Sequence, residues 1–438
     1  MLTVFVRDLI NHYEKRIKDL EARIEYLERE NEVLRKRLQL YENPHTPPSK
    51  LRKYRKKKEK KTPKKLGAPK GHKKYERKTP KPTELAMYKE DICPYCNSKL
   101  GKPFKIERVI EEEIPEPQPI RVIEHVIPHY KCPNCKKHVV AKNKAPKGRF
   151  GRNLSAHIAL MKFEDRLPFR KISNTLERIY GIKISDVGIY KVVNRVANSL
   201  SKSYQEIIER IRDSKVVYID ETEIKIDGQA YYLWTFTTYK DCVYAIRKSR
   251  RKKVISEILG DNYKGIIVCD GWKAYSMYSN NLQRCWAHLL REAKSLSERY
   301  PEFSYYYDEL KGIYMQVKEI AKKPPPLGER EDLRDKLRRK MIEIADKMDM
   351  HGEFQKFATK IKNGLEHWFT CVIKTFVEPT NNIAERALRE LIVQRKIFGG
   401  LRREKGARIM EVITSIISSV RMRGGNVFEF IKGCLWSG

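Results

Sequence analysis

The segment VVYID, at residues 216–220, constrains the fold of this chain more than any other. Four residues that suit a buried strand end abruptly at Asp220, and Glu221 and Glu223 follow within three positions. The chain around these acids has 438 residues and a formal net charge of +36. A fold for this sequence therefore has to explain why so basic a protein places carboxylates where an apolar strand ends.

The residues that follow Asp220 predict a particular order of strands. The segments AYYLWTFTTY and CVYAIRKS predict two further strands, KKVISEILGDNY predicts a helix, and GIIVCDGW predicts a fourth strand that ends at Asp270. Three antiparallel strands, a helix and a fourth strand beside the first are the opening order of an RNase H-like fold, in which Asp220 and Asp270 would lie close together. Each acid taken alone is more often an ordinary residue at a strand end.

A third acid is expected from a later helix. The segment PTNNIAERALRELIVQRK predicts a helix capped by Thr380, in which Glu385 shares a face with Asn381 and Arg389 at four-residue spacing. Solvated helices also carry Glu and Arg in this way, so Glu385 is a candidate site residue only in combination with the two aspartates.

Three converging carboxylates would repel one another unless cations neutralised them. Oxygen ligands of this kind suit magnesium or manganese. Two such ions about 3.5–4 Å apart can activate an attacking oxygen and stabilise a leaving one during phosphoryl displacement. The acids are therefore interpreted as a metal site that acts on a DNA phosphate.

Two Cys-x-x-Cys pairs predict a structural zinc site. They are CPYC, with Cys93 and Cys96, and CPNC, with Cys132 and Cys135. Four thiolates in tetrahedral geometry leave no open position, so this zinc would stabilise the fold and catalyse nothing. Two strand-like runs between the pairs predict a long hairpin. Redox thiols and chance spacing are the alternatives.

The N-terminal part of the chain divides into two segments. Residues 3–41 carry a heptad repeat of apolar residues, which with Asn31 at a seam position predicts a parallel coiled-coil homodimer. A helix packed on its own domain is the alternative. Residues 44–82 are rich in Lys and Pro, with almost nothing to bury, and predict a flexible basic linker. This linker either contacts the DNA phosphate backbone or is a solvated spacer.

The segment FRKISNTLERIYGIKISDVGIYKVVNRVANSL predicts two short helices around a turn. Gly181 ends the first helix and Ser185 caps the second, an arrangement that resembles a DNA-binding helix-turn-helix. Any two-helix corner looks similar. If the motif binds DNA, one face of the second helix enters the groove, with the residues Tyr190, Lys191, Asn194 and Arg195.

The segment CWAHLLRE follows an apparent fifth strand. Trp286 is expected in the core, with stacking on an unpaired base as the alternative. His288 either contacts the scissile phosphate or is structural, and Arg291 lies one turn further on. The helical stretch that follows, interrupted by KKPPPLGERED, is interpreted as an insertion before the helix of Glu385.

Bulk properties exclude several classes of protein. No stretch reaches the roughly 18 uncharged apolar residues of a membrane span, and the N-terminus lacks a signal-peptide pattern. Nine cysteines, an odd number, do not suit a secreted disulfide scaffold. We expect a cytoplasmic, nucleoid-associated protein of a prokaryote, without a membrane partner.

Several motifs together resemble one family. They are RVIEHVIPHYKCPNC, DET at residues 220–222, CDGWKAY around Asp270, CWAHLLRE, NNIAERALR and SIISSVRMRGGNVFEFI. Over nearly its whole length the chain resembles the transposases of insertion-sequence family 66, which are DDE transposases with an RNase H-like core. The resemblance implies that Asp220, Asp270 and Glu385 are the catalytic triad. It also implies double-stranded DNA partners (element ends and target), cleavage at the ends, joining of a 3′-hydroxyl to the target, and small accessory proteins in some elements.

The expected architecture is multidomain. An active transposase is the leading interpretation, and a catalytically silent DNA-binding protein derived from one, or a structure-selective DNA nuclease, are the alternatives. The expected domains are a coiled coil at 1–42, a basic linker at 43–84, a zinc ribbon at 85–145, a helix-turn-helix region at 146–205, an RNase H-like α/β catalytic domain at 206–400 with a helical insertion at about 293–371, and a C-terminal helical segment at 401–438.

Overall fold

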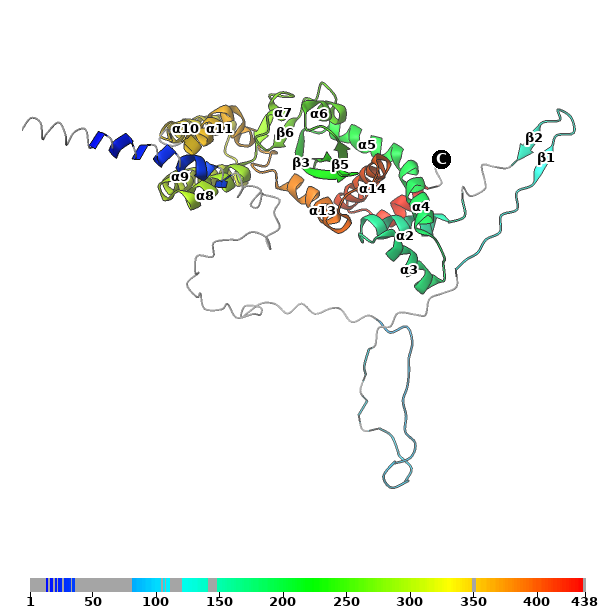
Figure 1. Ribbon diagram of the computed structural model, residues 1–438. Coiled ribbons are helices and arrows are strands. Elements are labelled where there is room, and N and C mark those ends of the chain that lie inside the picture. Colours follow the sequence, from blue (N-terminus) through cyan, green and yellow to red (C-terminus); the bar gives the residue numbers. More distant parts are fainter. Residues whose placement is uncertain are drawn as a thin grey trace, which may run out of the picture. The chain divides into compact units, whose positions relative to one another are not determined.

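The computed structural model describes two units of the chain, Met1–Glu113 and Ile114–Gly438 (Figure 1). The described residues are, with gaps, 13–35, and then 81–103, 105–106, 108–110, 120–140, 148–348 and 352–435. Most of the predicted basic linker lies outside these ranges. No helix within them is both long and apolar enough to cross a membrane.

The described residues between 13 and 35 are helical, as the heptads predict. The seam residues of this helix are exposed, with Ile17 at 54%, Leu20 at 56% and Ile24 at 56% of their full surface. The described residues of this unit thus leave the apolar stripe uncovered.

A five-stranded sheet organises the second unit. Its strand order is β5-β4-β3-β6-β7, with β3, β4 and β5 antiparallel, and β6 and β7 parallel to β3. The strands are β3 (Val216–Ile226), β4 (Gln229–Thr237), β5 (Cys242–Arg247), β6 (Ile266–Cys269) and β7 (Leu282–Arg284). The helix α6 (Lys252–Leu259) joins β5 to β6. The predicted order of three antiparallel strands, a helix and a parallel fourth strand is therefore confirmed.

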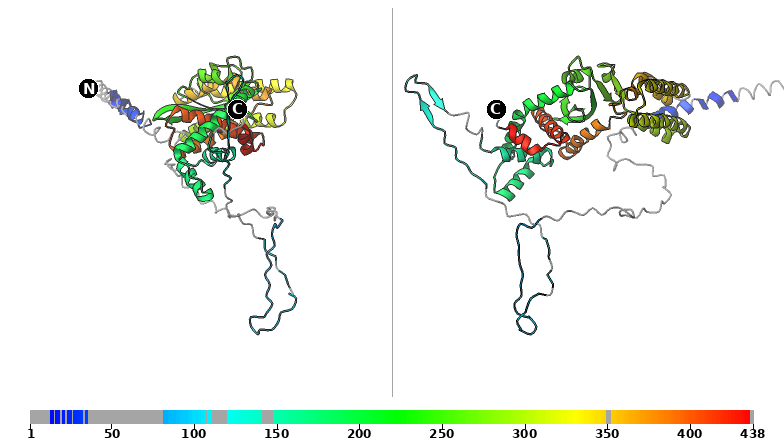
Figure 2. Two further views of the ribbon diagram at one scale, coloured as in Figure 1. Left: turned by 90° about the vertical axis from the view of Figure 1, so that its right-hand side faces the viewer. Right: turned by 180° about the vertical axis from the view of Figure 1, so that it is seen from behind.

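Helices cover both faces of the sheet (Figures 1 and 2). Val217 and Ile219 point to the face packed by one group of helices, whereas Val216 and Tyr218 point to the face packed by the other. The first group comprises α2 (Arg152–Phe163), α3 (Phe169–Tyr180), α4 (Asp186–Ser199), α5 (Ser201–Arg212), α6, α7 (Lys273–Ser276) and α15 (Val427–Cys434). The second comprises α8 (Trp286–Arg299), α9 (Ser304–Lys322), α10 (Leu327–Asp346), α11 (Gly352–Asn363), α12 (Thr370–Ile373) and α13 (Asn382–Phe398).

The helix α14 (Glu404–Met422) runs along the outer edge of β5. Three of its side chains, spaced four residues apart, accept hydrogen bonds from alternate backbone N–H groups of the strand. The pairs are Cys242 N to Ser419 Oγ at 2.9 Å, Tyr244 N to Ser415 Oγ at 2.9 Å, and Ile246 N to Glu411 Oε1 at 2.7 Å. The spacing works because two residues of strand and one turn of helix both advance the chain by similar distances.

The two-helix corner forms as the sequence predicts. The helix α3 ends at Gly181, whose φ of 65° needs a residue without a Cβ penalty. Ser185 caps α4, because its Oγ accepts a hydrogen bond from Gly188 N at 3.1 Å. The local prediction is confirmed, while DNA binding by this corner stays a prediction.

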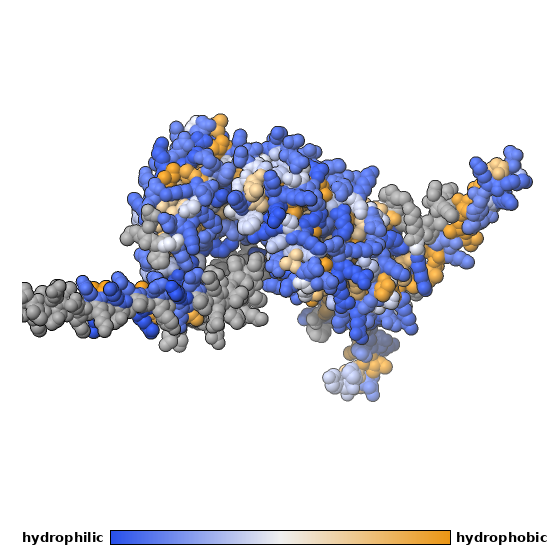
Figure 3. All heavy atoms as spheres, turned by 45° about the horizontal axis from the view of Figure 1, so that its top comes forward, coloured by the Kyte–Doolittle hydropathy of each residue, from blue (hydrophilic) through white to orange (hydrophobic). Residues whose placement is uncertain are grey.

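Much of the long hairpin predicted between the two Cys pairs, including residues 111–119, lies outside the described residues. On either side of the second Cys pair the chain forms a short antiparallel pair, β1 (His129–Lys131) with β2 (His138–Val140). The apolar side chains before β1 are exposed, with Val122 at 86% and Val126 at 82%. Figure 3 shows hydrophobic side chains on the surface of this part of the chain.

We predict that Ser415→Ala lowers the free energy of unfolding by about 1–3 kcal/mol, because the buried Tyr244 N–H loses its acceptor. Urea unfolding followed by tryptophan fluorescence measures the change. Ser418→Ala on the same helix is the control, since the Ser418 hydroxyl bonds the Tyr244 hydroxyl at 3.3 Å and not a backbone N–H of the strand. Equal effects of the two substitutions would contradict the role given to the edge contacts.

Candidate active site

Asp220 and Asp270 are placed by the parallel pairing of β3 with β6. The register pairs Val217 with Ile267 and Tyr218 with Val268, so two residues further on Asp220 is level with Asp270. Each carboxylate accepts a local backbone hydrogen bond, from Glu221 N at 3.0 Å and from Trp272 N at 2.8 Å respectively. The strand of Asp220 does not end there, as the sequence suggested, but continues to Ile226, so the sheet brings an acid inside β3 level with one that follows the last residue of β6.

Glu385 is brought to the same place by the start of α13. Asn381 precedes this helix, and its Nδ2 donates to Ile219 O at 2.7 Å, one residue before Asp220. Pro379 O accepts from Trp286 N at 3.0 Å, which holds the preceding loop against α8. The predicted cap at Thr380 is wrong, because Asn381 takes the N-cap position and its amide bonds to β3 instead of to its own helix.

The electrostatics indicate that the three acids share one environment. Burial raises the pKa of Asp220 well above its usual range, and the neighbouring carboxylates of Glu221, Asp270 and Glu385 raise it further. Such a cluster favours either a shared proton or a bound cation. An all-oxygen donor set of this kind fits a hard divalent ion such as magnesium or manganese.

Glu221 lies on the opposite face of the sheet from Asp220, as strand alternation predicts. Its side chain is 1% exposed and accepts a hydrogen bond from Arg250 Nε at 2.6 Å and another from the Tyr275 hydroxyl. Burial, followed by the charge of Asp270, raises the pKa of Glu221. This residue therefore braces the segment around Asp270 and does not belong to the open acid cluster.

The same brace fixes Trp272, which the sequence did not single out. The Arg250 guanidinium lies 4.3 Å from the Trp272 ring centre, and the indole N–H donates to Arg250 O at 3.1 Å. Trp272 is 42% exposed and sits two residues from Asp270. The feature that marks Trp272 is the exposure of its side chain, and exposure cannot be read from a sequence. The result is a rigid aromatic surface beside the acids.

The predicted supporting residues divide into two groups. His288 Nε2 lies 3.6 Å and Arg291 Nη2 lies 3.4 Å from Glu385 Oε1, so both accompany the acid cluster. Burial lowers the pKa of His288, and the Arg291 charge acts in the same direction against the opposing effect of Glu385. Arg389 is exposed on α13, one turn beyond Glu385.

Trp286 is fully buried among Tyr314, Trp368 and Phe369, so the expected core position is confirmed and base stacking by Trp286 is excluded.

The residues predicted to face a DNA groove differ in their surroundings. Lys191 is exposed on α4, and Asn194 is half-buried. Tyr190 packs edge-on against Phe169. Arg195 donates to Phe150 O and to Ser155 Oγ, both at 2.9 Å, and so ties α4 to the start of α2.

The two Cys pairs form matching turns in their respective units. Cys93 N bonds Ser98 O and Asn97 N bonds Cys93 O, and the corresponding bonds recur around Cys132. Asn97 and Lys136 both have a φ near 60°. Hydrogen bonds lower the pKa of Cys96, mainly from Ser98, and of Cys132, mainly from the Cys135 backbone. Because the thiolate is the metal-binding form, each turn fits half of a four-thiolate zinc site.

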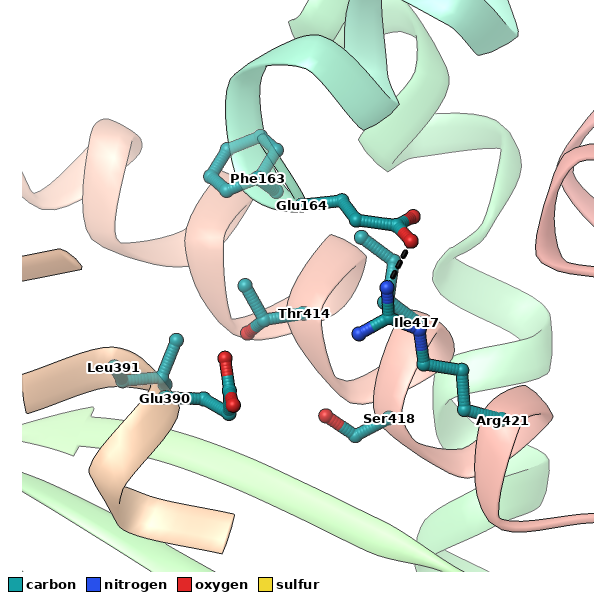
Figure 4. Close-up of a pocket in the computed structure, with 8 residues that line it drawn as sticks. All are labelled: Phe163, Glu164, Glu390, Leu391, Thr414, Ile417, Ser418 and Arg421. Carbon is teal, nitrogen blue, oxygen red and sulfur yellow. Dashed lines mark hydrogen bonds and ion pairs between the residues drawn. The ribbon is translucent and has the colours of Figure 1, made fainter. Parts of the chain in front are cut away.

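A small hollow opens between α2, α13 and α14, and the Glu164–Arg421 ion pair lies in its lining (Figure 4). Its lining includes Phe163, Glu390 and Thr414. None of the predicted site residues lines it. The hollow is therefore separate from the candidate active site.

Family comparison identifies the class of protein to which this chain belongs. The model of the IS66 transposase family matches residues 147–409, which is more than half of the chain. The zinc-finger binding domain of IS66 transposases matches residues 90–136. The chain belongs to the IS66 transposase family, and its N-terminal Cys pairs lie in the zinc-finger domain of that family.

Two relatives come from Sinorhizobium fredii (strain NBRC 101917 / NGR234). The uncharacterized protein y4qI is 22% identical over 325 residues, which cover 64% of this chain and 58% of that protein. The uncharacterized protein y4jD is 22% identical over 365 residues, which cover 73% of this chain and 69% of that protein. The chain thus matches somewhat more than half of the first relative and about two thirds of the second.

We predict that, without added divalent ions, the chain loses thermal stability as pH rises. A carboxyl whose folded pKa is raised stabilises the fold below its unfolded pKa, and this contribution is lost as pH rises through the folded pKa. Melting temperatures measured from pH 5 to pH 8 should therefore fall less steeply for Asp220→Asn. Parallel profiles for the two proteins would count against the raised pKa of Asp220.

Proposed function

We propose that this chain is an active DNA transposase that cuts DNA at the ends of its element and joins the freed 3′-hydroxyls to target DNA. The observation that supports the proposal is the register that brings Asp220 level with Asp270, together with the docking of Asn381 on β3, which carries Glu385 in the first turn of α13. The strand order supports an RNase H-like core. The two protein relatives carry no functional name, so the activity of the whole chain is proposed from the family and the site.

The acid cluster would hold magnesium or manganese through Asp220, Asp270 and Glu385. Ions bound there supply Lewis-acid stabilisation of the attacking and the leaving oxygen in an in-line displacement. His288 and Arg291 add positive or hydrogen-bonding groups next to Glu385, where a phosphate would lie. Asn381 positions the first turn of α13, while Arg389 extends the basic surface along the same helix.

Two displacements at phosphorus make up the reaction. In the first, a water oxygen bonds to the scissile phosphorus and loses a proton, the P–O3′ bond breaks, and the departing oxygen takes up a proton to become a 3′-hydroxyl, which leaves a 5′-phosphate. In the second, that hydroxyl bonds to a target phosphorus and loses its proton, and the released target oxygen takes up a proton to become a 3′-hydroxyl. Both steps replace one oxygen by another at a phosphodiester phosphorus, so one arrangement of acids serves both.

DNA binding and assembly are assigned to the remaining parts. We place the element ends against α4, where Lys191 is exposed, and against the Lys-rich residues 43–84. The exposed heptad residues of the N-terminal helix support a parallel homodimer that could hold two ends. The Cys pairs would bind structural zinc. Such a protein would act on chromosomal DNA in the cytoplasm of a prokaryote, with accessory proteins of the element as further partners.

The three acids are tested with the chain, DNA carrying the ends of its own element, and magnesium. Asp220→Ala, Asp270→Ala and Glu385→Ala should each reduce strand cleavage at least about a hundredfold, because each removes a charge from the metal site, while end binding persists. Glu390→Gln, an exposed change on α13, is the control. Normal cleavage by any triad variant would remove that residue from the assignment.

The products separate the alternatives. Nicked and joined DNA supports a transposase, nicked DNA without joining indicates a nuclease, and binding without any cleavage indicates a silent DNA-binding protein.

The proposed dimer has its own prediction. Asn31→Leu should change the oligomeric state, because a buried Asn at a seam position specifies a two-stranded register at some cost in stability. Light scattering measures the mass of the particle in solution. A dimer that persists unchanged would contradict the heptad argument.

A further inference from the structure

Cys285, His288 and Glu385 form a cluster of potential metal ligands that the proposed reaction does not fully use. One ligand atom from each residue lies within 4.8 Å of the others. Cys285 is the N-cap residue of α8, His288 lies in the first turn of that helix, and Glu385 lies in the first turn of α13. The cluster therefore depends on the same docking of α13 that completes the acid cluster.

Two buried polar atoms at this cluster have no hydrogen-bond partner in the described part of the chain. They are His288 Nδ1 and Asn381 Oδ1. Asn381 is fully buried and its backbone N–H donates to Cys285 Sγ at 3.1 Å, so its unsatisfied oxygen belongs to the same neighbourhood. Leaving a buried polar atom unpaired costs about 1–3 kcal/mol. Two such atoms beside a thiol and a carboxylate point to a ligand that the polypeptide alone does not supply.

The donor set differs in kind from the acid cluster. A thiolate and an imidazole prefer zinc or cobalt, whereas Asp220 and Asp270 offer only the hard oxygens that suit magnesium. Ligand atoms around tetrahedral zinc lie roughly 3.5 Å apart, given bonds of about 2.0–2.3 Å. Small rotations of the His288 and Glu385 side chains, which move their ligand atoms by about 1 Å, would bring the atoms from their present spacing to the spacing around zinc.

We propose that Cys285, His288 and Glu385 bind a transition-metal ion, Zn²⁺ or Co²⁺, at a site that shares Glu385 with the magnesium cluster. Binding at this site does not depend on the proposed function. The effect of binding on cleavage does rest on the proposed function, because an ion held by Cys285 and His288 withdraws Glu385 from Asp220 and Asp270. Zinc therefore inhibits magnesium-supported cleavage.

The binding test uses the full chain with its N-terminal zinc already bound. Equilibrium dialysis against Zn²⁺ should load one more zinc per chain on the wild type than on Cys285→Ser or His288→Ala. Added Co²⁺ should give a thiolate-to-cobalt absorption band in the wild type that Cys285→Ser lacks. Serine keeps an acceptor for Asn381 N and is a preferred N-cap residue, so this variant retains the fold.

Cys371→Ser is the matched control, since Cys371 is an equally buried cysteine outside the cluster. It should bind the additional zinc and show the cobalt band. Equal zinc uptake by the wild type and Cys285→Ser would overturn the proposal, and so would loss of the band in Cys371→Ser alone.

A second measurement separates this inference from the proposed function. In a cleavage assay with magnesium, zinc should inhibit the wild type at least about tenfold more strongly than Cys285→Ser, and added magnesium should relieve the inhibition. If no cleavage occurs at all, the proposed function fails while the dialysis and cobalt results still decide the metal site. If cleavage occurs and zinc inhibits both proteins equally, the shared role of Glu385 is wrong.

Discussion

The parallel hydrogen bonding of β3 with β6 is the interaction on which the functional part of the structure depends. It fixes the register that brings Asp220 level with Asp270, and it holds in place the strand onto which Asn381 docks α13. Without this pairing, Asp220 and Asp270 would be 50 positions apart along the chain, and Glu385 lies much further on. The candidate active site is thus a product of sheet register more than of any local motif.

Strand alternation then gives the two neighbouring acids different work. Asp220 points to the face covered by α8 and α13, where an open cluster of carboxylates forms. Glu221 points to the other face, where its carboxylate accepts hydrogen bonds from Arg250 and Tyr275. The motif DET therefore places a candidate catalytic residue next to a residue that supports the segment around Asp270. A slip of β3 by one residue would turn Asp220 and Glu221 to the opposite faces of the sheet, so neither side chain would reach its present partners.

Sequence reasoning succeeded where local chemistry decides the outcome. The αL glycine at Gly181 and the cap at Ser185 depend only on nearby backbone atoms, and the strand order follows from periodicity. It failed where a distant partner decides. Asn381 takes the N-cap position in place of Thr380 because β3 offers its side chain the acceptor Ile219 O. Trp272 was missed since its exposure and its Arg250 partner are tertiary facts.

The contacts of α14 with β5 have a consequence for how copies of this protein can associate. An edge strand with open N–H groups invites another chain to add a strand beside it. Here the acceptors at residues 411, 415 and 419 already occupy those groups, and the opposite edge offers only the three-residue β7. A second copy of the chain therefore finds no open N–H groups at these positions of β5, so copies that associate would do so through other surfaces than this sheet edge.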